Sequence, residues 1–274
     1  MEIGKFNQLK IARMVDFGAY LTDGDKEVLM PGKYLPDGAR VGDDIRAFVY
    51  TDSEDRLIAT SLTPFATVGE FAYLQVNQVN KIGAFLDWGL EKDLLVPFSE
   101  QKSKMMEDGV YLVYVYLDDN THRIVASAKV EKFLGNVIPT YRRGQQVHAL
   151  VCGHSEIGYR AIVDNLHWGM IYDNEIYTPI EVEQTVTAYV KNVRDDGKID
   201  LSLNSPAAAK RVDSLADRVL EMVVNGTLSL TDKSSPDDIK EKLQCSKKDF
   251  KKTVGALYRQ HKVIIGEDGK ISAS

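Results

Sequence analysis

Three copies of one β-rich pattern run through residues 1–203, and this repetition constrains the fold more than any single residue does. The copies contain FGAYL (17–21), EVLMP (27–31) and DRLIATSL (55–62); IGAFL (82–86), DLLVP (93–97) and HRIVASA (122–128); and, more loosely, IGYRAI (157–162), WGMIY (168–172) and GKIDLSL (197–203). Each copy spans about 65 residues, which suits a self-contained small domain and not a solenoid unit. Small β modules in tandem are more typical of binding proteins than of enzymes.

Short strands that close into a barrel are the structure that each copy predicts. Residues 110–117 and 186–193 are rich in β-branched and aromatic residues, with the alternation of a half-buried sheet. Turn sequences separate such segments: TDGDK (22–26), TDSED (51–55), LDDNT (117–121) and RDDGK (194–198). About five strands in so short a copy favour a barrel, because a small open sheet would leave unprotected edges.

A different pattern begins after Leu203. Residues 210–226 have apolar side chains at helical spacing and end at Gly226. Ser235, followed by Pro236 and by Asp238 three positions on, predicts a capped helix start. A third helix is expected from Ser246 to about Gln260, and two short strands follow within residues 263–273. This order of elements is that of a winged helix-turn-helix.

Charge is unevenly distributed along the chain. The net charge is −6, yet residues 1–64, 65–137 and 138–209 each carry −3, whereas residues 210–274 carry +3. An acidic bulk repels a polyanion, but screening limits that repulsion to about 8 Å in physiological salt. A nucleic-acid site must therefore be local, built from a few cations and aromatic faces.

Composition and length exclude several classes of protein. Hydrophobic content of 44% and charged content of 27% are ordinary for a globular protein. No run of about 18 apolar residues predicts a membrane helix, and the amino terminus has no secretory signal. Cys152 and Cys245 lie far apart in different predicted domains, so we expect no disulfide framework and a cytoplasmic location.

The repeats resemble the S1-type RNA-binding module, a five-stranded OB barrel, because FGAYL, EVLMP and GKIDLSL occur in the order of that module. The stretch 232–265, together with three preceding modules, resembles the conserved virulence factor B (CvfB) family of bacterial proteins. The resemblance covers essentially the whole chain. It implies a mainly β, multi-domain fold, with S1-type OB domains at residues 1–64, 65–137 and 138–206 and a winged helix-turn-helix at 207–274. It also implies a non-enzymatic, RNA-binding post-transcriptional regulator without a cofactor.

The resemblance further implies a set of RNA-contacting residues on strands two and three of each barrel and before the last strand. Carried over to this sequence, the set is Phe17, Tyr20, Asp52 and Arg56 in the first repeat, Phe85 and Arg123 in the second, and Arg160, Tyr172 and Lys198 in the third. Ile82 and Ile157 replace the first aromatic residue, and Pro31 and Pro97 replace a histidine. A simpler interpretation remains open: alternation puts Phe17 with Ala19 and Leu21, opposite Tyr20, so one aromatic could be core. Trp88 and Trp168 are more typical of packing.

The third predicted helix of the tail has a basic face. Lys248, Lys251, Lys252 and Arg259 share it, Lys247 lies beside its start, and an apolar face formed by Phe250, Val254, Leu257 and Tyr258 is separate. This arrangement suits contact with a groove or a phosphate backbone. A solvated lysine face is the alternative. The helix alone does not distinguish RNA, DNA or an acidic protein.

Signals of catalysis are weak. The chain lacks G-x-x-x-x-G-K-[ST], G-x-S-x-G and H-E-x-x-H motifs. Cys152 and His154 have no partner pair that would make a metal site, and a cysteine on an apolar strand is usually core. We therefore expect neither enzyme activity nor a small-molecule substrate or metal. The S1 resemblance implies single-stranded RNA as the partner. The alternatives are a protein-interaction scaffold docking on the ribosome or RNA polymerase, and a DNA-binding regulator.

Overall fold

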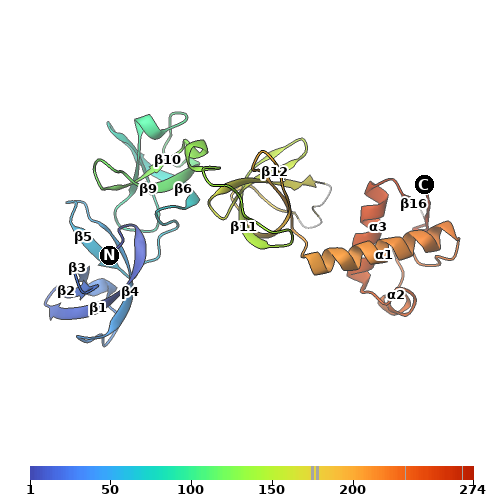
Figure 1. The fold of residues 1–274 in the computed structure, drawn as a ribbon, viewed down its shortest axis with the longest axis horizontal. Coiled ribbons are helices and arrows are strands. Elements are labelled where there is room, and N and C mark those ends of the chain that lie inside the picture. The colour runs from blue at the N-terminus through green and yellow to red at the C-terminus, as the bar shows by residue number, and fades with distance from the viewer. Residues whose placement is uncertain (174–175, 177–178, 232, 267) are drawn as a thin grey trace. The chain divides into compact units, whose positions relative to one another are not determined.

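A computed structural model describes residues 1–173, 176, 179–231, 233–266 and 268–274, and the side chains of these residues outside 206–214. The chain divides into two compact units, residues 1–136 and 137–274. Each unit is described by itself below (Figure 1).

Three closed five-stranded barrels fill most of the chain, and they share one topology. Their strands are β1 (Lys5–Val15), β2 (Gly18–Thr22), β3 (Glu27–Pro31), β4 (Asp44–Thr51) and β5 (Leu57–Thr60) in barrel 1; β6 (Phe71–Val79), β7 (Gly83–Leu86), β8 (Leu94–Pro97), β9 (Val110–Leu117) and β10 (Ile124–Ser127) in barrel 2; and β11 (Gln146–Ser155), β12 (Gly158–Val163), β13 (His167–Tyr172), β14 (Thr185–Val193) and β15 (Ile199–Ser202) in barrel 3. Around each barrel the order is first, second, third, fifth, fourth, and the third and fifth strands are parallel. The predicted fold class is confirmed.

A bulge interrupts the first strand of every barrel at the same place. The register shifts between Ile11 and Arg13 in β1, between Val76 and Gln78 in β6, and between Val151 and Gly153 in β11. A bulge adds local twist, which lets a long first strand pair with two neighbours and close the barrel.

A glycine that the backbone requires begins the second strand of each barrel. A Cβ on Gly18 would lie 2.1 Å from the carbonyl oxygen of Met30, and one on Gly158 would lie 2.2 Å from that of Ile171. The φ angles of +155° and +146° are also rarely adopted by residues with side chains. Gly83 has the same close approach, at 2.2 Å from the carbonyl oxygen of Val96. The second and third strands can therefore pair closely only with glycine here.

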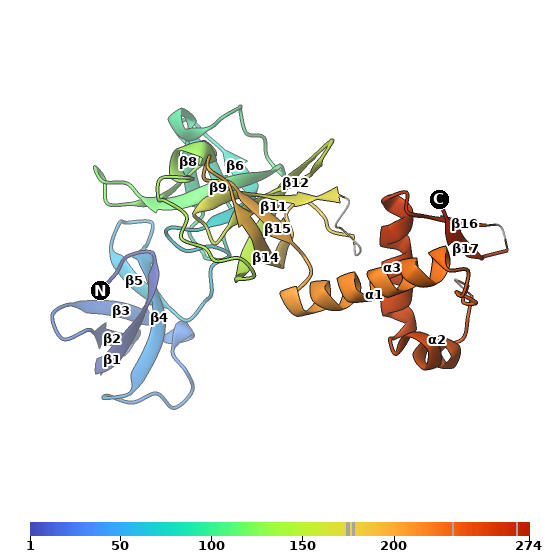
Figure 2. The same ribbon diagram turned by 45° about the vertical axis from the view of Figure 1, so that its right-hand side comes forward.

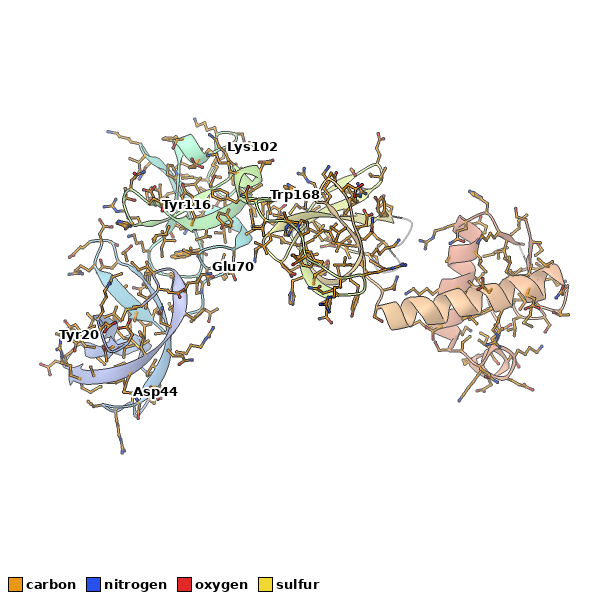
Figure 3. The ribbon with its side chains drawn as sticks, in the orientation of Figure 1. Tyr20, Asp44, Glu70, Lys102, Tyr116 and Trp168 are labelled. Atoms are coloured by element: carbon orange, nitrogen blue, oxygen red, sulfur yellow. The ribbon has the colours of Figure 1, made fainter. Side chains whose placement is uncertain are left out.

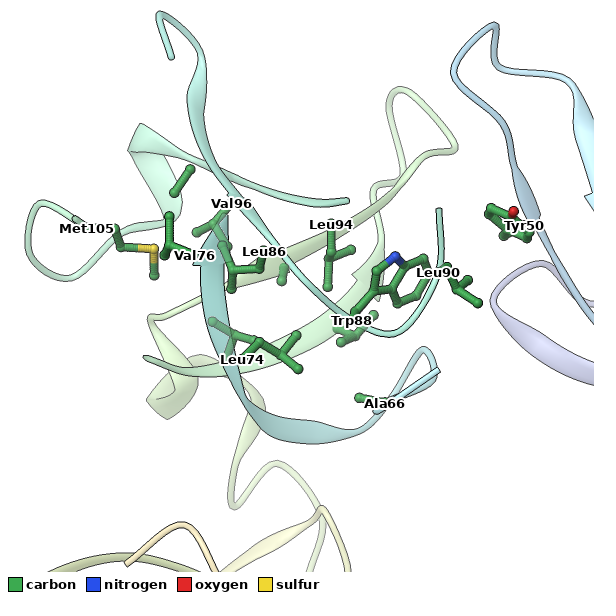
Figure 4. Packing of buried hydrophobic residues seen from close by; sticks show 14 of the residues in the cluster. Tyr50, Ala66, Leu74, Val76, Leu86, Trp88, Leu90, Leu94, Val96 and Met105 are labelled. Atoms are coloured by element: carbon green, nitrogen blue, oxygen red, sulfur yellow. The ribbon is translucent and has the colours of Figure 1, made fainter. Parts of the chain in front are cut away.

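Barrels 1 and 2 share part of a core. Trp88, in the loop between β7 and β8, is 2% exposed and packs edge-on against Phe48 and Tyr50 of β4, with ring centroids 5.8 and 6.4 Å away. Figure 4 shows Trp88 between the interior of barrel 2 and Tyr50. The indole nitrogen donates to the carbonyl of Lys92 at 2.6 Å, which satisfies the buried N–H. Trp88 is therefore a packing residue, as its type suggested, and it joins two domains.

Barrel 3 has a core built from its own strands. Its buried residues include Val151, Ala161, Ile171 and Leu201, each 0% exposed. They point inward by strand alternation, whereas Trp168, Met170 and Tyr172 alternate with them on β13 and are half-buried.

Helices and a short hairpin form the last domain. They are α1 (Pro206–Val224), α2 (Pro236–Leu243), α3 (Lys247–Arg259), β16 (Val263–Ile265) and β17 (Ile271–Ala273). α3 crosses α1 in both ribbon views (Figure 2), and its Phe250 is 0% exposed in the core between the helices. Ser235 caps α2 by accepting from the Asp238 N–H at 3.1 Å, as predicted. Ser246 caps α3 in the same way.

Short 3₁₀ turns complete the chain at Gly32–Tyr34, Phe98–Glu100 and Val130–Phe133. Within the described residues, every helix is too short or too polar to cross a membrane. The boundaries of the four domains drawn from the sequence stay a prediction.

Candidate functional site

The residue before the required glycine is exposed in every barrel. Phe17, Ile82 and Ile157 are 60%, 58% and 57% exposed, respectively. Each carbonyl accepts from the backbone N–H of a residue that follows the third strand, for example Gly32 N–H to Phe17 at 2.9 Å. Each barrel thus presents one large apolar side chain to solvent on a constrained turn.

Phe17 lies outside the core, which excludes the alternative in which alternation buries it with Ala19 and Leu21. β2 begins at Gly18, so the alternating pattern does not extend back to Phe17. Ala19 and Leu21 are 0% exposed and do point inward. Neither aromatic residue of FGAYL is therefore core, and Phe17 is available for contact on the surface.

Tyr20, labelled in Figure 3, is half-buried on β2 beneath an arginine. The Arg13 guanidinium lies 3.6 Å from the centre of the Tyr20 ring, and Arg13 is ion-paired with Glu27 at 3.0 Å. Arg13 faces Tyr20 because the bulge in β1 brings the two residues into register. One face of the ring is thus covered by a cation, so a base could stack on Tyr20 only after Arg13 moves or by stacking on Arg13 itself.

Asp52 and Arg56 hold the turn between β4 and β5. Arg56 donates twice to Asp52 Oδ2, at 2.9 and 2.7 Å, and the backbone N–H groups of Glu54 and Arg56 donate to Oδ1 at 2.9 and 3.0 Å. Burial opposes ionisation of Asp52, but these hydrogen bonds outweigh it and lower the pKa of the carboxyl group. The Arg56 side chain remains 67% exposed and can still reach a ligand.

Arg123 of barrel 2 contacts barrel 1. Its guanidinium donates to Asp55, which also lies 3.7 Å from the Lys92 ammonium. Lys92 donates to the carbonyl of Asp52 at 2.6 Å, and burial lowers its pKa. Arg123, which the resemblance assigns to RNA contact, is therefore also part of the contact between barrels 1 and 2. No local sequence pattern indicates this contact, because it depends on how two separate modules pack. Phe85, the other carried-over residue of barrel 2, is half-buried on β7.

Barrel 3 carries a polar network that the sequence reasoning missed. Arg194 donates to Asp200 Oδ1 from Nε at 2.8 Å and also donates to the Tyr172 hydroxyl, which in turn donates to Asp200 at 3.2 Å. Tyr172 was a predicted site residue, but Arg194 and Asp200 were not.

Backbone pairing identifies the counterpart of Arg194 in the other barrels. Its N–H donates to the carbonyl of Lys198 at 2.9 Å, as the N–H of Asp52 does to Arg56 and that of Asp118 does to Arg123, both at 2.9 Å. Barrels 1 and 2 thus have an aspartate where barrel 3 has an arginine. If RDDGK and TDSED are aligned so that Arg194 falls opposite Asp52, the sequences alone show the change from a negative to a positive side chain at this position.

Arg160 and Lys198 are both exposed on barrel 3, but they have different surroundings. The Arg160 guanidinium lies 4.4 Å from the centre of the Trp168 ring, which forms a flat cationic surface on β12 and β13. Lys198 is ion-paired with Asp196 at 2.9 Å at the tip of the turn, and Lys198 lowers the pKa of that carboxyl group. Trp168 is half-buried, so it is both a packing residue and part of the surface.

The five basic residues assigned to α3 differ in their exposure. Lys248, Lys251 and Arg259 are exposed, whereas Lys247 and Lys252 are half-buried. Lys252 donates to Asn204 Oδ1, and burial lowers its pKa. Arg259 donates to the carbonyl of Ile176 at 3.4 Å. Tyr258, expected on the apolar face, is 52% exposed.

Neither cysteine has the surroundings of a nucleophile. Burial raises the pKa of the Cys152 thiol to about 11, and it raises that of Cys245 as well. Over the described part of the chain, no three His, Cys, Asp or Glu side chains group closely enough to hold a metal ion.

Comparisons with known proteins agree with this architecture. The S1 domain model matches residues 3–62 and 68–129, and the model of the CvfB-like winged helix domain matches residues 217–272. The chain is 28% identical to the uncharacterized protein YitL of Bacillus subtilis, over 96% of this chain and 91% of that protein. It is also 28% identical to conserved virulence factor B of Staphylococcus aureus strain USA300, over 86% of this chain and 81% of that protein.

One solved structure also matches over nearly the whole length. It is a multidomain protein with nucleic acid binding domains from Streptococcus pneumoniae TIGR4, 23% identical, with a TM-score of 0.42 and coverage of 99% of this chain and 98% of that chain. The S1 matches support nucleic-acid binding. The chain therefore contains S1 domains followed by a CvfB-like winged helix domain, and it is similar over most of its length to proteins named conserved virulence factor B.

Proposed function

We propose that this protein is a non-enzymatic RNA-binding protein, a post-transcriptional regulator that binds single-stranded RNA through its barrel faces and the basic face of α3. The observation that carries the proposal is the pairing of exposed Lys248 and Lys251 with the exposed ring of Tyr258 on one helix of an otherwise acidic chain. Cations that contact phosphates together with an aromatic face for bases are the combination that single-strand binders use.

Phe17 of barrel 1 offers a second contact. A base stacked on an aromatic side chain contributes about 1–3 kcal/mol and tolerates any sequence, since every base has a flat π surface. Phe17 is 60% exposed, so it has little packing to lose on binding. Tyr20 and Arg56 belong to the same barrel, and we propose that they extend this contact.

Salt-dependent binding tests the proposal. We expect the full chain to bind a fluorescent oligouridine 20-mer, with affinity that falls as salt rises. The double variant Lys248→Ala with Lys251→Ala should reduce the slope of log affinity against log salt by about 1.4, because each lost phosphate contact removes about 0.7 for a single strand. Lys240→Ala with Lys242→Ala removes equal charge from α2 and should change the slope much less.

Two results would contradict the proposal. Absence of binding to any homopolymer RNA at 50 mM salt would exclude it. Tighter binding to a duplex DNA than to single-stranded RNA of equal length would favour a DNA-binding regulator instead.

Phe17→Ala should weaken RNA binding, whereas Phe65→Ala, which removes a ring that is 66% exposed, should not.

A further inference from the structure

Gly255 is half-buried on the face of α3 opposite its buried residues, where neither the described packing nor the backbone conformation calls for glycine. Among the residues that the structure describes, a Cβ built at this position would meet nothing within 4 Å. Its φ angle is not positive, since it is not among the positive-φ residues of the described chain. Glycine within a helix costs about 1 kcal/mol relative to alanine. The domain would therefore fold at least as well with a small side chain here.

The neighbours of Gly255 on the helix surface are those of a polyanion site. Residues three and four positions away lie beside it, namely Lys251, Lys252, Tyr258 and Arg259, and Lys248 follows one turn beyond Lys251. Opposite this face, Phe250, Val254 and Leu257 are buried in the core at 0%, 3% and 2% exposure, so α3 cannot rotate to present another side. The missing side chain thus leaves a notch in the centre of a ring of cations.

A notch of this kind changes what can approach the helix. A side chain at position 255 would hold a ligand backbone several ångströms away from the helix axis, whereas glycine lets it lie against the helix itself. At that depth a phosphate is within reach of the long side chain of Lys251, one helical turn away, and Coulomb attraction rises as the separation falls. The exposed Tyr258 ring at the edge offers a face on which an unpaired base can stack.

We propose that Gly255 forms a seat for the phosphodiester backbone of single-stranded RNA on α3, with Lys248 and Lys251 contacting the phosphates and Tyr258 stacking a neighbouring base. This inference rests on the proposed function and adds to it the point of closest approach. Lys252 and Arg259, which have partners within residues 137–274, border the seat.

Substitutions of increasing size at Gly255 test the seat in the full chain. Gly255→Ala and Gly255→Leu should raise or preserve the melting temperature of the winged helix domain, because both residues favour helix more than glycine does. Affinity for the oligouridine 20-mer should fall slightly for Gly255→Ala and about tenfold for Gly255→Leu. Lys240→Leu, which places leucine and removes a charge on α2, should bind nearly as the parent does.

The outcomes separate this inference from the proposed function. If Gly255→Leu binds normally while the Lys248→Ala, Lys251→Ala variant binds weakly, the proposed role of Gly255 is contradicted and the proposed function is still supported. Normal binding by both would overturn the seat and the role of α3 in RNA binding. A preference of the parent chain for duplex DNA over the oligouridine would also overturn the seat. Weak binding by both with an intact melting transition would support it.

Discussion

Barrels 1 and 3 share a backbone plan and differ on their outward faces. Both close with the same strand order, the same bulge in the first strand and the same crowded glycine, Gly18 or Gly158. One position in the turn before the last strand carries opposite charges in the two barrels: it is Asp52 in barrel 1 and Arg194 in barrel 3. Barrel 1 also shares a core with its neighbour, whereas the core of barrel 3 comes from its own strands.

The difference shows which residues specify the fold and which are left to specify binding. Inward residues and the glycine are required by packing, so they recur in every copy. Outward residues are not required by the barrel, so Arg194, Asp200 and Tyr172 can form a network where barrel 1 has Asp52, Ile58 and Pro31. Three copies of a barrel therefore do not imply three equal binding sites.

The largest effect is expected from Trp88→Ala. Removing a buried tryptophan costs about 4 kcal/mol, because the cavity is large and Phe48 and Tyr50 lose their packing partner. Hydrogen exchange by mass spectrometry should show faster exchange in barrels 1 and 2 and unchanged exchange in barrel 3. Trp168→Ala, at a half-buried site, should have a smaller effect that stays in barrel 3. Equal effects on all three barrels would contradict the separate cores.

Gly158→Ala tests the feature that the barrels share. The new Cβ would lie 2.2 Å from the carbonyl oxygen of Ile171, so the pairing of β12 with β13 must open, at a cost of about 3 kcal/mol. Denaturant unfolding followed by the fluorescence of Trp168 measures this cost. Gly153→Ala lies on the adjacent strand, where no described residue comes within 4 Å of the added Cβ, so it should be nearly neutral. Comparable stability of the two variants would show that the glycine is not required.

Sequence patterns predicted the barrels, the capped helices and the hairpin, because each depends on local alternation, turns and caps. They left open whether Phe17 is core, because the alternation in FGAYL could be extended back one residue beyond the start of β2. They missed the contact of Arg123 with Asp55, because no local pattern encodes how two barrels pack. They also missed Arg194, whose counterpart in the other copies is identified by a backbone hydrogen bond and not by residue type.

Arg194→Gln tests whether the outward face of barrel 3 contributes to RNA binding. If barrel 3 contributes to RNA binding, loss of this cation should lower affinity for the oligouridine about tenfold, or about 1.4 kcal/mol. Glutamine can still hydrogen-bond to Asp200, so the turn should keep its shape. Arg142→Gln removes an exposed arginine that lies before β11 and should have little effect. An unchanged affinity in Arg194→Gln would mean that the charge reversal has no role in binding.

The smallest effect is the pH dependence of the turn in barrel 1. The pKa of Asp52 is lowered in the folded state, so its ionised form stabilises folding above the ordinary aspartate pKa of about 3.9, and this contribution is lost as the pH falls through the folded value. Asp52→Asn should cost about 1 kcal/mol at pH 7, since the bonds from Arg56 and from two backbone N–H groups weaken. Below pH 4 the variant and the parent should converge, as measured by urea unfolding at several pH values. Asp25→Asn, at an exposed position in another turn of the same barrel, should not change the pH profile in this way. A constant difference between Asp52→Asn and the parent from pH 7 to pH 3 would show that the charge of Asp52 does not stabilise the turn.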